Sequence, residues 1–345
     1  MQCPDKEQMV SKALRVAVLG FWHVHAGDYA LRTLSHPGTQ LIAVWDGDGA
    51  RGRAAAAEFG VSYAGDLDSL LGRQDIDAVI VTTATNVHRD VMVKAATAGK
   101  HIFTEKLLAP TVVQAEEIID AADANGVKLV VSLPRLYHGS TRAIMDVIES
   151  GKLGQIGYCR VRLSHDGAVS RDAAVGWLPE RFFEPASAIG GALTDLGCHP
   201  VYLTQLFLGS DPDTVSATYR SLTHRAVDDH AVVTIGYPDQ KIGVIEAGFV
   251  SDNPFTVEIF GTDGSLMYTH DGNVLRVAGQ AFGSEEFQRI PVPDDGPDAF
   301  DQWVDHIRGE TRADDNLARA VELTRLVAAA NLAALEGRTI SYPTT

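Results

Sequence analysis

The stretch Leu14-Arg15-Val16-Ala17-Val18-Leu19, followed at once by Gly20, decides the fold of this chain. The run is short, mostly apolar and partly β-branched, which is typical of a buried strand. The residues after Gly20 predict a helix to about Ser35, which His36-Pro37-Gly38 would stop. The chain therefore begins its ordered part with a strand, a glycine turn and a helix.

The same alternation continues for about 120 residues. Apolar strands are predicted at residues 41–45, 78–82, 101–104 and 127–132, with helices at 51–59, 87–98 and 111–125 between them. Continuous apolar strands separated by helices indicate a parallel sheet that is buried on both faces. We expect residues 14–132 to form one α/β domain, a doubly wound Rossmann sheet.

The pattern changes after Pro134. A helix at 140–150 is followed by alternating strands at 156–164, 214–220, 231–236, 241–249, 256–261 and 265–269, with a helix at 192–208 among them. Helices at 298–308 and 316–335 close the chain. This order predicts an α+β domain over residues 133–345 with a largely antiparallel open sheet, for substrate binding and oligomerisation. Residues 1–13 are expected to be a mobile tail.

Composition excludes several classes of protein. The 345 residues carry 29 basic and 45 acidic side chains, a formal charge of −16. Such a surface repels nucleic acid and anionic membranes, so neither is expected as a partner. No apolar stretch of about 18 residues is present, so no membrane span is predicted.

The cysteines indicate a reducing compartment. Cys3, Cys159 and Cys198 are odd in number, widely spaced and free of any CxxC motif. This argues against a disulfide scaffold or a structural zinc site and favours the cytoplasm. The polar first dozen residues contain no apolar segment of a signal peptide.

The turn after the first strand suggests a dinucleotide. A helix that follows a strand and a glycine presents its first N–H groups to a diphosphate. Of the usual GxGxxG only Gly20 is present, because Trp22 and His25 occupy the other glycine positions. Asp46 ends the second strand, where a carboxylate can accept hydrogen bonds from the adenosine ribose and repel a 2′-phosphate. We therefore expect NAD in preference to NADP, although Asp46 could instead only cap the next helix.

His23 and His25 form an HxH pair. Two imidazoles at this spacing could ligate one ion, but the sequence offers no third ligand nearby and no HExxH or CxxC. No metal is expected, and contact with the cofactor diphosphate or with the substrate is the favoured role of the pair.

Three further motifs, in order, resemble one family. Residues 83–88 (TATNVH), 98–107 (AGKHIFTEKL) and 190–199 (GGALTDLGCH) are similar to the TPxxxH, AGKHVxxEKP and GGGxLxDxGxH motifs of the glucose–fructose oxidoreductase/inositol dehydrogenase (Gfo/Idh/MocA) family. Residues 337–340 also resemble the family's ending. The resemblance covers residues 14 to 342, with Ala84 and Leu107 in place of two prolines.

The resemblance implies roles for particular residues. Lys106, Asp195 and His199 would be catalytic: Lys106 would hold the reacting alcohol, and His199 would take its proton. Asp195, four residues before His199, would orient a sugar hydroxyl or the imidazole. The cofactor would contact Gly20, Phe21, Trp22, His23, Asp46, Thr83, Thr85, His88, Glu105 and Lys106.

Substrate contacts are expected from aromatic and basic side chains. They are His25, Arg135, Tyr137, His138, Arg162, His165 and Trp177. Rings of this kind stack on the apolar face of a sugar, and guanidinium groups bind an acidic substituent.

Three functions follow from these residues. The first is an NAD-dependent dehydrogenase that removes hydride from a secondary alcohol of a sugar, polyol or sugar derivative. The alternative is an NAD-dependent glycosidase that oxidises C3 transiently, eliminates the aglycone, adds water and re-reduces, with Tyr137 or His138 as an extra base. The third, a sensor that binds NAD and sugar without turnover, is disfavoured because Lys106, Asp195 and His199 are all present. A homo-oligomer is expected from the open sheet.

Overall fold

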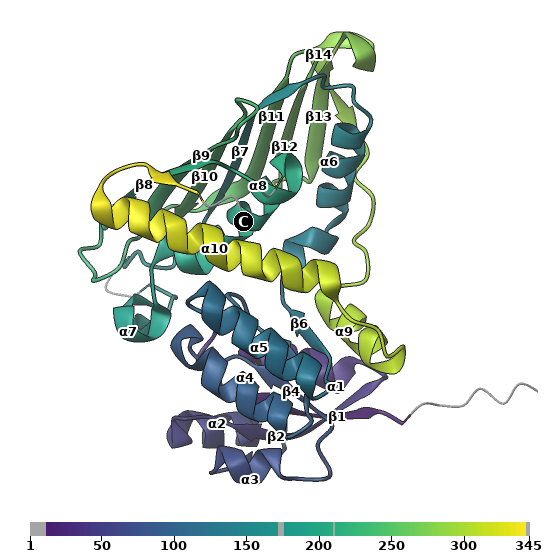
Figure 1. Ribbon diagram of the computed structural model, residues 1–345, viewed down its shortest axis with the longest axis vertical. Coiled ribbons are helices and arrows are strands. Elements are labelled where there is room, and N and C mark those ends of the chain that lie inside the picture. Colours follow the sequence, from purple (N-terminus) through teal and green to yellow (C-terminus); the bar gives the residue numbers. More distant parts are fainter. Residues whose placement is uncertain (1–11, 172–175, 210, 343–345) are drawn as a thin grey trace, which may run out of the picture.

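The computed structural model describes residues 12–171, 176–209 and 211–342. The expected mobile tail, apart from Lys12 and Ala13, lies outside the described residues. The chain forms an N-terminal parallel sheet flanked by helices and a larger second sheet, and the long helix α10 runs between the two (Figure 1).

The N-terminal domain is the predicted doubly wound sheet, with strand order β3-β2-β1-β4-β5-β6 and parallel pairing throughout. Its strands are β1 (Leu14–Leu19), β2 (Thr39–Trp45), β3 (Ser62–Ala64), β4 (Ala78–Val81), β5 (His101–Thr104) and β6 (Leu129–Val131). Its helices are α1 (Ala26–Ser35), α2 (Gly49–Phe59), α3 (Leu67–Leu71), η1 (Thr85–Val87), α4 (His88–Thr97) and α5 (Val112–Ala124).

Both faces of this sheet are buried, as the apolar strands predicted. In β1, Val16 and Val18 join one hydrophobic cluster while Ala17 and Leu19 join another on the opposite face. Alternate residues of a strand point to opposite faces, so a strand covered on both sides must be apolar throughout.

The second domain is built on a nine-stranded sheet with the order β14-β13-β12-β11-β7-β10-β9-β8-β15. Pairing is antiparallel except between β7 and β10. The strands are β7 (Ile156–Ser164), β8 (Thr214–Arg220), β9 (His230–Gly236), β10 (Ile242–Gly248), β11 (Asn253–Gly261), β12 (Ser265–Thr269), β13 (Val274–Gly279), β14 (Ser284–Ile290) and β15 (Ile340–Ser341). The helical segments are η2 (Pro134–Tyr137), α6 (Gly139–Glu149), η3 (Glu180–Phe183), α7 (Pro185–Ala188), η4 (Leu193–Gly197), α8 (Cys198–Leu208), η5 (Gln280–Phe282), α9 (Ala299–Arg308) and α10 (Asp314–Glu336).

One face of the large sheet packs against helices. Helix α8 contacts β7 and β10, and α10 contacts β8 and also reaches α5 and β6 of the first domain. The other face carries partly exposed side chains such as Tyr158, Val232, Ile242 and Phe260. The sheet is therefore open on one side, as predicted.

The sequence missed some short elements and two full strands of the second sheet. Strand β3, helix α3 and strands β13, β14 and β15 were not predicted. The expected helix at 192–208 is a π-helical turn, η4, that continues into α8. None of the helices in the described ranges is long and apolar enough to cross a membrane.

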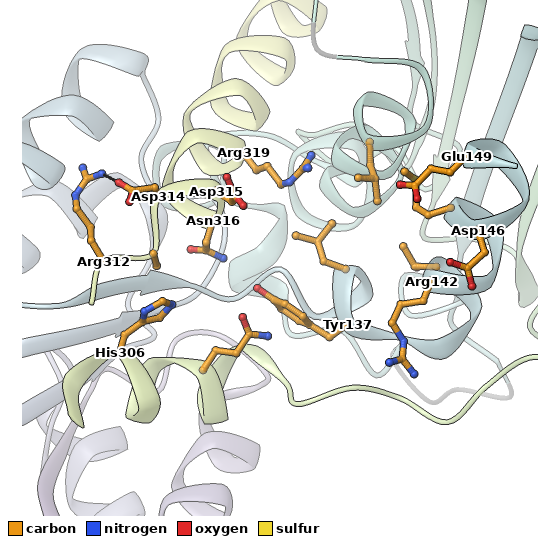
Figure 2. A pocket seen from close by; sticks show the side chains of 16 residues that line it. Tyr137, Arg142, Asp146, Glu149, His306, Arg312, Asp314, Asp315, Asn316 and Arg319 are labelled. Atoms are coloured by element: carbon orange, nitrogen blue, oxygen red, sulfur yellow. Dashed lines mark hydrogen bonds and ion pairs between the residues drawn. The ribbon is translucent and has the colours of Figure 1, made fainter. Parts of the chain in front are cut away.

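A groove of about 820 Å³ lies in the second domain between α6, α9 and the start of α10 (Figure 2). Its lining is charged and includes Arg142, Asp146, Glu149, Arg312, Asp314, Asp315 and Arg319.

Candidate active site

The candidate site lies at the carboxyl edge of the parallel sheet. The strand order reverses between β1 and β4, and the residues that follow β1, β2, β4, β5 and β6 meet at this edge. In open α/β sheets, ligands bind at such a switch point.

Gly20 makes the turn after β1 possible. Its φ is +91°, and a Cβ on it would lie 2.7 Å from Cγ2 of Thr83, which follows the neighbouring strand β4. A side chain at this position would be both strained and in collision. The first glycine of the motif is therefore required for the fold of the loop, whatever the loop binds.

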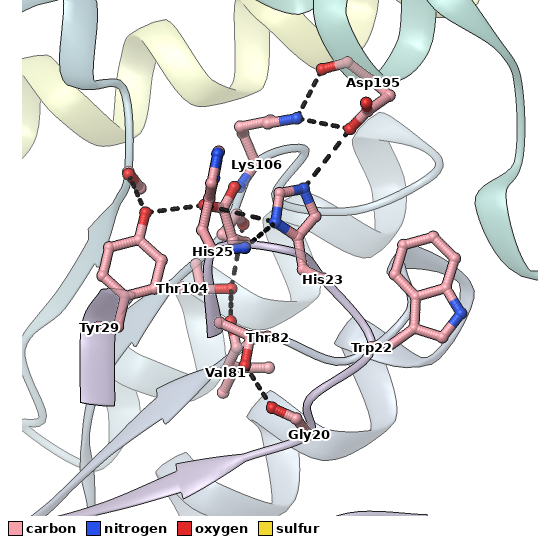
Figure 3. Close-up of polar contacts among 12 residues, drawn as sticks. Gly20, Trp22, His23, His25, Tyr29, Val81, Thr82, Thr104, Lys106 and Asp195 are labelled. Carbon is pink, nitrogen blue, oxygen red and sulfur yellow. Dashed lines mark hydrogen bonds and ion pairs between the residues drawn. The ribbon is translucent and has the colours of Figure 1, made fainter. Parts of the chain in front are cut away.

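Lys106 is the central cation of the site. It follows β5, its side chain is 3% exposed, and its Nζ donates to Oδ1 of Asp195 at 2.8 Å and to the backbone oxygen of Asp195 at 2.5 Å. Figure 3 shows the two side chains pointing toward each other from the two domains. The link joins the Rossmann edge to the turn η4.

Charge complementarity keeps this buried pair ionised. Burial alone would lower the pKa of Lys106, but the charges of Asp195, Cys198 and Glu105 and the hydrogen bond to Asp195 together outweigh burial and raise the pKa. Burial would raise the pKa of Asp195, but the charges of and hydrogen bonds to Lys106 and His23 together hold it well below its ordinary value. Lys106 is therefore an ammonium donor over the whole working pH range.

Glu105 is the centre of a second set of contacts. Its side chain is 2% exposed, and Oε1 accepts from Tyr29 Oη at 2.7 Å and lies 2.9 Å from Nδ1 of His25. Tyr29 also bonds Ser132, which follows β6. The buried carboxylate thereby orients the half-exposed imidazole of His25. Burial lowers and the hydrogen bond to Glu105 raises the pKa of His25, with a net increase.

His23 connects the two carboxylates. Its ring is buried, with Nδ1 3.8 Å from Oε1 of Glu105 and Nε2 3.5 Å from Oδ1 of Asp195. The atoms of His23, His25 and Glu105 lie close enough together to hold a metal ion, so a third ligand does exist in space. That no metal is bound stays our prediction, because Nδ1 of His25 already lies 2.9 Å from Oε1 of Glu105.

His199 lies at the start of α8 and is positioned by a tyrosine. Its ring is buried, and Nδ1 lies 3.0 Å from Tyr202 Oη. Burial, followed by the charges of Lys106 and Arg135, holds the pKa of His199 well below its ordinary value. The imidazole is neutral near pH 7 and suited to accept a proton. The expectation that Asp195 orients this ring is wrong, because Asp195 is engaged by Lys106 and Tyr202 is the partner of His199.

Asp46 lies at the end of β2, as predicted, but its oxygens are not free. Oδ2 accepts from Phe21 N at 2.6 Å and Arg51 Nε at 2.8 Å. Oδ1 accepts from Asp48 N and a terminal nitrogen of Arg51, both at 2.7 Å. The contact of Asp46 with the adenosine ribose stays a prediction, whereas the alternative that Asp46 caps the next helix is wrong, because Asp48 is the N-cap of α2.

The second domain reaches over the glycine loop. The ring of Trp22 stacks on Phe182 with centroids 4.6 Å apart, and Nε of Arg181 donates to the backbone oxygen of Trp22 at 2.6 Å. His23 also meets Phe182 edge-on. Trp22, at the second glycine position, and its neighbour His23 thus form part of the domain interface.

The cofactor residues after β4 divide into two kinds. Thr83 is 6% exposed and lies against Gly20, whereas Thr85 is half-buried in η1. His88 is fully buried, and its Nδ1 lies 2.9 Å from the backbone oxygen of Leu107. His88 therefore supports the loop that carries Lys106, and the expectation that it lines the cleft is wrong.

The expected substrate residues are only partly brought together. His165 stacks between Phe249 and Trp177, and the charges of Asp195 and Lys106 reach it, so it borders the site. Trp177 is 57% exposed beside it. Arg135 lies over the ring of Phe255 at 4.4 Å and acts on the pKa of His199.

Three of the expected substrate residues lie elsewhere. Arg162 is on the open face of the sheet, paired with Glu246. Tyr137 lines the charged groove of Figure 2, and His138 is adjacent at the start of α6. The extra base expected from Tyr137 or His138 is therefore not in the Lys106 site.

Sequence reasoning missed several residues of the site. Tyr29 and Tyr202 follow His25 and His199 by four and three positions on helices, so helical spacing could have suggested both. Arg51 lies in the first turn of α2, five residues after Asp46, so sequence proximity could have suggested their pairing. For Arg181 and Phe182 no local signal exists, since the contact with the glycine loop is made only by folding.

Comparison with known proteins identifies the family. Residues 14–133 match the model described as "Oxidoreductase family, NAD-binding Rossmann fold", and residues 141–267 match the "GFO/IDH/MocA C-terminal domain". The chain belongs to the Gfo/Idh/MocA oxidoreductases. The doubly wound domain is accordingly an NAD-binding domain, as the sequence predicted.

Characterised relatives point to sugars and polyols. A dTDP-3,4-didehydro-2,6-dideoxy-alpha-D-glucose 3-reductase of Streptomyces antibioticus is 30% identical over 75% of this chain and 76% of its own. The scyllo-inositol 2-dehydrogenase (NAD(+)) of Bacillus subtilis is 29% identical over 73% of both chains. The structure of a levoglucosan dehydrogenase in complex with NADH and L-sorbose superposes with a TM-score of 0.80 over 96% of this chain and 99% of the other, at 20% identity.

Proposed function

We propose that this protein is an NAD-dependent dehydrogenase that oxidises a secondary alcohol of a sugar, polyol or sugar derivative, or reduces the corresponding ketone. The observation that carries the proposal is the buried ammonium of Lys106 at the switch point of the sheet, held by Asp195 and close enough to His199 for its charge to act there. The named relatives support the class of substrate.

The residues at this edge fit a nicotinamide dinucleotide. The first turn of α1 suits the anionic centre of such a ligand, Glu105 lies at the end where the nicotinamide ribose would be, and Arg51, held by Asp46, lies at the end where the adenosine ribose would be. Bound nicotinamide supplies the hydride acceptor for the alcohol carbon.

Each side chain of the site has a separate role in the proposed reaction. Lys106 donates a hydrogen bond to the reacting oxygen and favours the developing alkoxide. His199 is neutral and takes the hydroxyl proton on its Nε2, since Nδ1 faces Tyr202. Asp195 holds the ammonium in place, and His23 links it to Glu105.

A second candidate is a redox-neutral lyase or glycosidase that oxidises, eliminates and re-reduces. The observation that favours it is a second imidazole, His25, which Glu105 orients beside Lys106. The pKa of His25 is raised and the pKa of His199 is lowered, so the two imidazoles suit the roles of general acid and general base. A 2,7-anhydro-N-acetylneuraminate hydratase of Mediterraneibacter gnavus, 27% identical over 70% of this chain, is among the relatives.

One incubation separates the two candidates. The protein is mixed with NAD and a panel of sugars, polyols and glycosides while NADH absorbance and released aglycone are followed together. We expect stoichiometric NADH from at least one free sugar or polyol. Aglycone release without net NADH would support the second candidate, and neither signal from a broad panel would contradict both.

We propose that two copies associate through the open face of the large sheet. Val232, Ile242 and Phe260 are 44%, 48% and 36% exposed on this face. Light scattering should show a homo-oligomer, and Ile242→Glu should shift it toward the monomer. Cys159 and Cys198 are buried thiols, in keeping with the cytoplasmic location that we propose.

A further inference from the structure

The adenosine end of the site contains more positive charge than the sequence indicates. Four hydrogen-bond donors fill the oxygens of Asp46, which is 3% exposed: two backbone N–H groups and two nitrogens of Arg51. A carboxylate offers about four lone-pair positions, so the capacity of Asp46 is used. Its charge is also balanced by the guanidinium.

Arg51 is placed to face a ligand at this position. It lies in the first turn of α2, directly after the end of β2, and its side chain is 30% exposed. The pair with Asp46 uses Nε and one terminal nitrogen, and the hydrogen bond to Asp46 raises the pKa of Arg51. A planar guanidinium beside the ribose position is the feature by which Rossmann domains accept a 2′-phosphate.

A second guanidinium comes from the other domain. Arg181 of η3 uses its Nε for the backbone oxygen of Trp22 at 2.6 Å. Within the described ranges, no carboxylate lies within 4.0 Å of its guanidinium nitrogens. The residue before Trp22, Phe21, donates its backbone N–H to Asp46, which also holds Arg51, so both guanidinium groups border the same turn of the glycine loop. Burial, followed by the charge of Arg51, lowers the pKa of Arg181. Two adjacent guanidinium groups attract an anion, and phosphate oxygens match their geometry.

We propose that Arg51 and Arg181 together form a site for the 2′-phosphate of NADP, so that this protein accepts NADP as well as NAD. The inference rests on the proposed function, because it assumes that this sheet edge holds a nicotinamide dinucleotide. Asp46 then acts as the residue that positions Arg51. The bound phosphate would also link the two domains, because Arg51 belongs to the N-terminal domain and Arg181 to the second domain.

Calorimetric titration of the unmodified protein with NAD, NADP, ADP and 2′,5′-ADP tests this directly. We expect Kd values for NAD and NADP within about tenfold of each other, and 2′,5′-ADP tighter than ADP. Arg181→Gln should raise the Kd of NADP and of 2′,5′-ADP by about tenfold or more, the range for the loss of a charge-assisted contact. It should raise the Kd of NAD and of ADP by less than about threefold.

Matched variants keep the test interpretable. Arg51→Gln leaves the buried Asp46 without its partner, so Arg51→Lys, which keeps the charge, is measured beside it. Arg53→Gln is the control, because Arg53 lies on the same helix but over the ring of Tyr63. It should change none of the four affinities.

Three results would overturn the inference. One is NAD binding without NADP binding. Another is an equal loss of affinity for NAD and for NADP in Arg181→Gln, which would assign Arg181 to the diphosphate that both dinucleotides share. The third is a Kd for 2′,5′-ADP that is no lower than the Kd for ADP. Absence of binding by any dinucleotide would instead contradict the proposed function, so the two failures are distinguishable.

Discussion

The two ends of the same sheet edge handle charge in different ways. At the reacting end, Lys106 is 3% exposed and bound by Asp195, and Glu105 is 2% exposed and bound by His25 and Tyr29. At the adenosine end, Arg51 is paired but 30% exposed, and Arg181 bonds the backbone oxygen of Trp22 in the same glycine loop, without a carboxylate partner in the described chain. One end is a closed, pre-arranged network suited to proton and hydride movement, whereas the other keeps positive charge available for a ligand.

This contrast predicts where each substitution acts. Changes at the reacting end should alter turnover and leave dinucleotide affinity nearly constant, since their atoms contact one another and the reacting oxygen. Changes at the adenosine end should alter affinity and cofactor choice. The predictions below begin with the largest expected effect.

Lys106→Met should reduce turnover by about two to four powers of ten, the usual worth of a group that stabilises a developing alkoxide. NAD affinity, measured by fluorescence titration, should change little. Lys94→Met is the control, because Lys94 pairs with Asp68 on the exposed surface. Turnover at the unmodified rate in Lys106→Met would remove this residue from the reaction.

Tyr202→Phe should reduce turnover by about tenfold, because the hydroxyl that orients His199 is removed, with KM nearly unchanged. A base must be neutral, so activity should fall only when the pH drops below the lowered pKa of His199. The unmodified enzyme should show no loss from His199 between about pH 6.5 and 8.

Tyr219→Phe provides the comparison for Tyr202, because Tyr219 bonds Asn331 between β8 and α10. It should leave kcat and the pH profile unchanged. An equal loss in both variants would indicate general destabilisation and not a role for Tyr202 at His199.

His25→Gln should change the pH dependence of stability. The pKa of His25 is raised by Glu105 in the folded state, so the stabilisation is fully present below the unfolded pKa of about 6.5. It is lost as the pH rises through the raised folded pKa. The Tm difference between the unmodified protein and His25→Gln should therefore shrink from pH 6 to pH 9, and a constant difference would count against the His25–Glu105 contact.

Chelation should have the smallest effect. We expect EDTA to leave NAD affinity and activity unchanged, and elemental analysis to find no stoichiometric ion. The contact of His25 with Glu105 already engages two of the three candidate ligands. Stoichiometric zinc that is lost together with activity would show that His23, His25 and Glu105 form a metal site.

The sequence predicted the regular parts of the fold and the motif-borne part of the site. Strand β1, the alternating elements to β6 and the positions of Lys106, Asp195 and His199 follow from apolar periodicity and from family motifs. Contacts between distant segments could not be predicted. Arg162 shows the limit clearly, because alternation in β7 turns it to the open face, whereas the sequence gives no sign of which face borders the site.

The adenosine end illustrates the same limit in a single pair. The pattern of strand, glycine and acidic residue identified Asp46, yet the saturation of its oxygens depends on the rotamer of Arg51 and on backbone N–H groups of two loops. Arg181 is 130 residues further along the chain, so its proximity depends on how the domains pack. Cofactor choice was therefore less predictable than cofactor class.

The central claim is that hydride passes directly between a substrate carbon and the nicotinamide beside Lys106. It is tested by giving the enzyme NAD and a substrate deuterated at the carbinol carbon, once the panel has identified one, and recovering the NADH for mass spectrometry. The account predicts one deuterium on the nicotinamide ring for each ketone formed, and loss of that transfer in Lys106→Met at saturating NAD. Ketone formation with unlabelled NADH, or deuterium transfer at the unmodified rate in Lys106→Met, would contradict it.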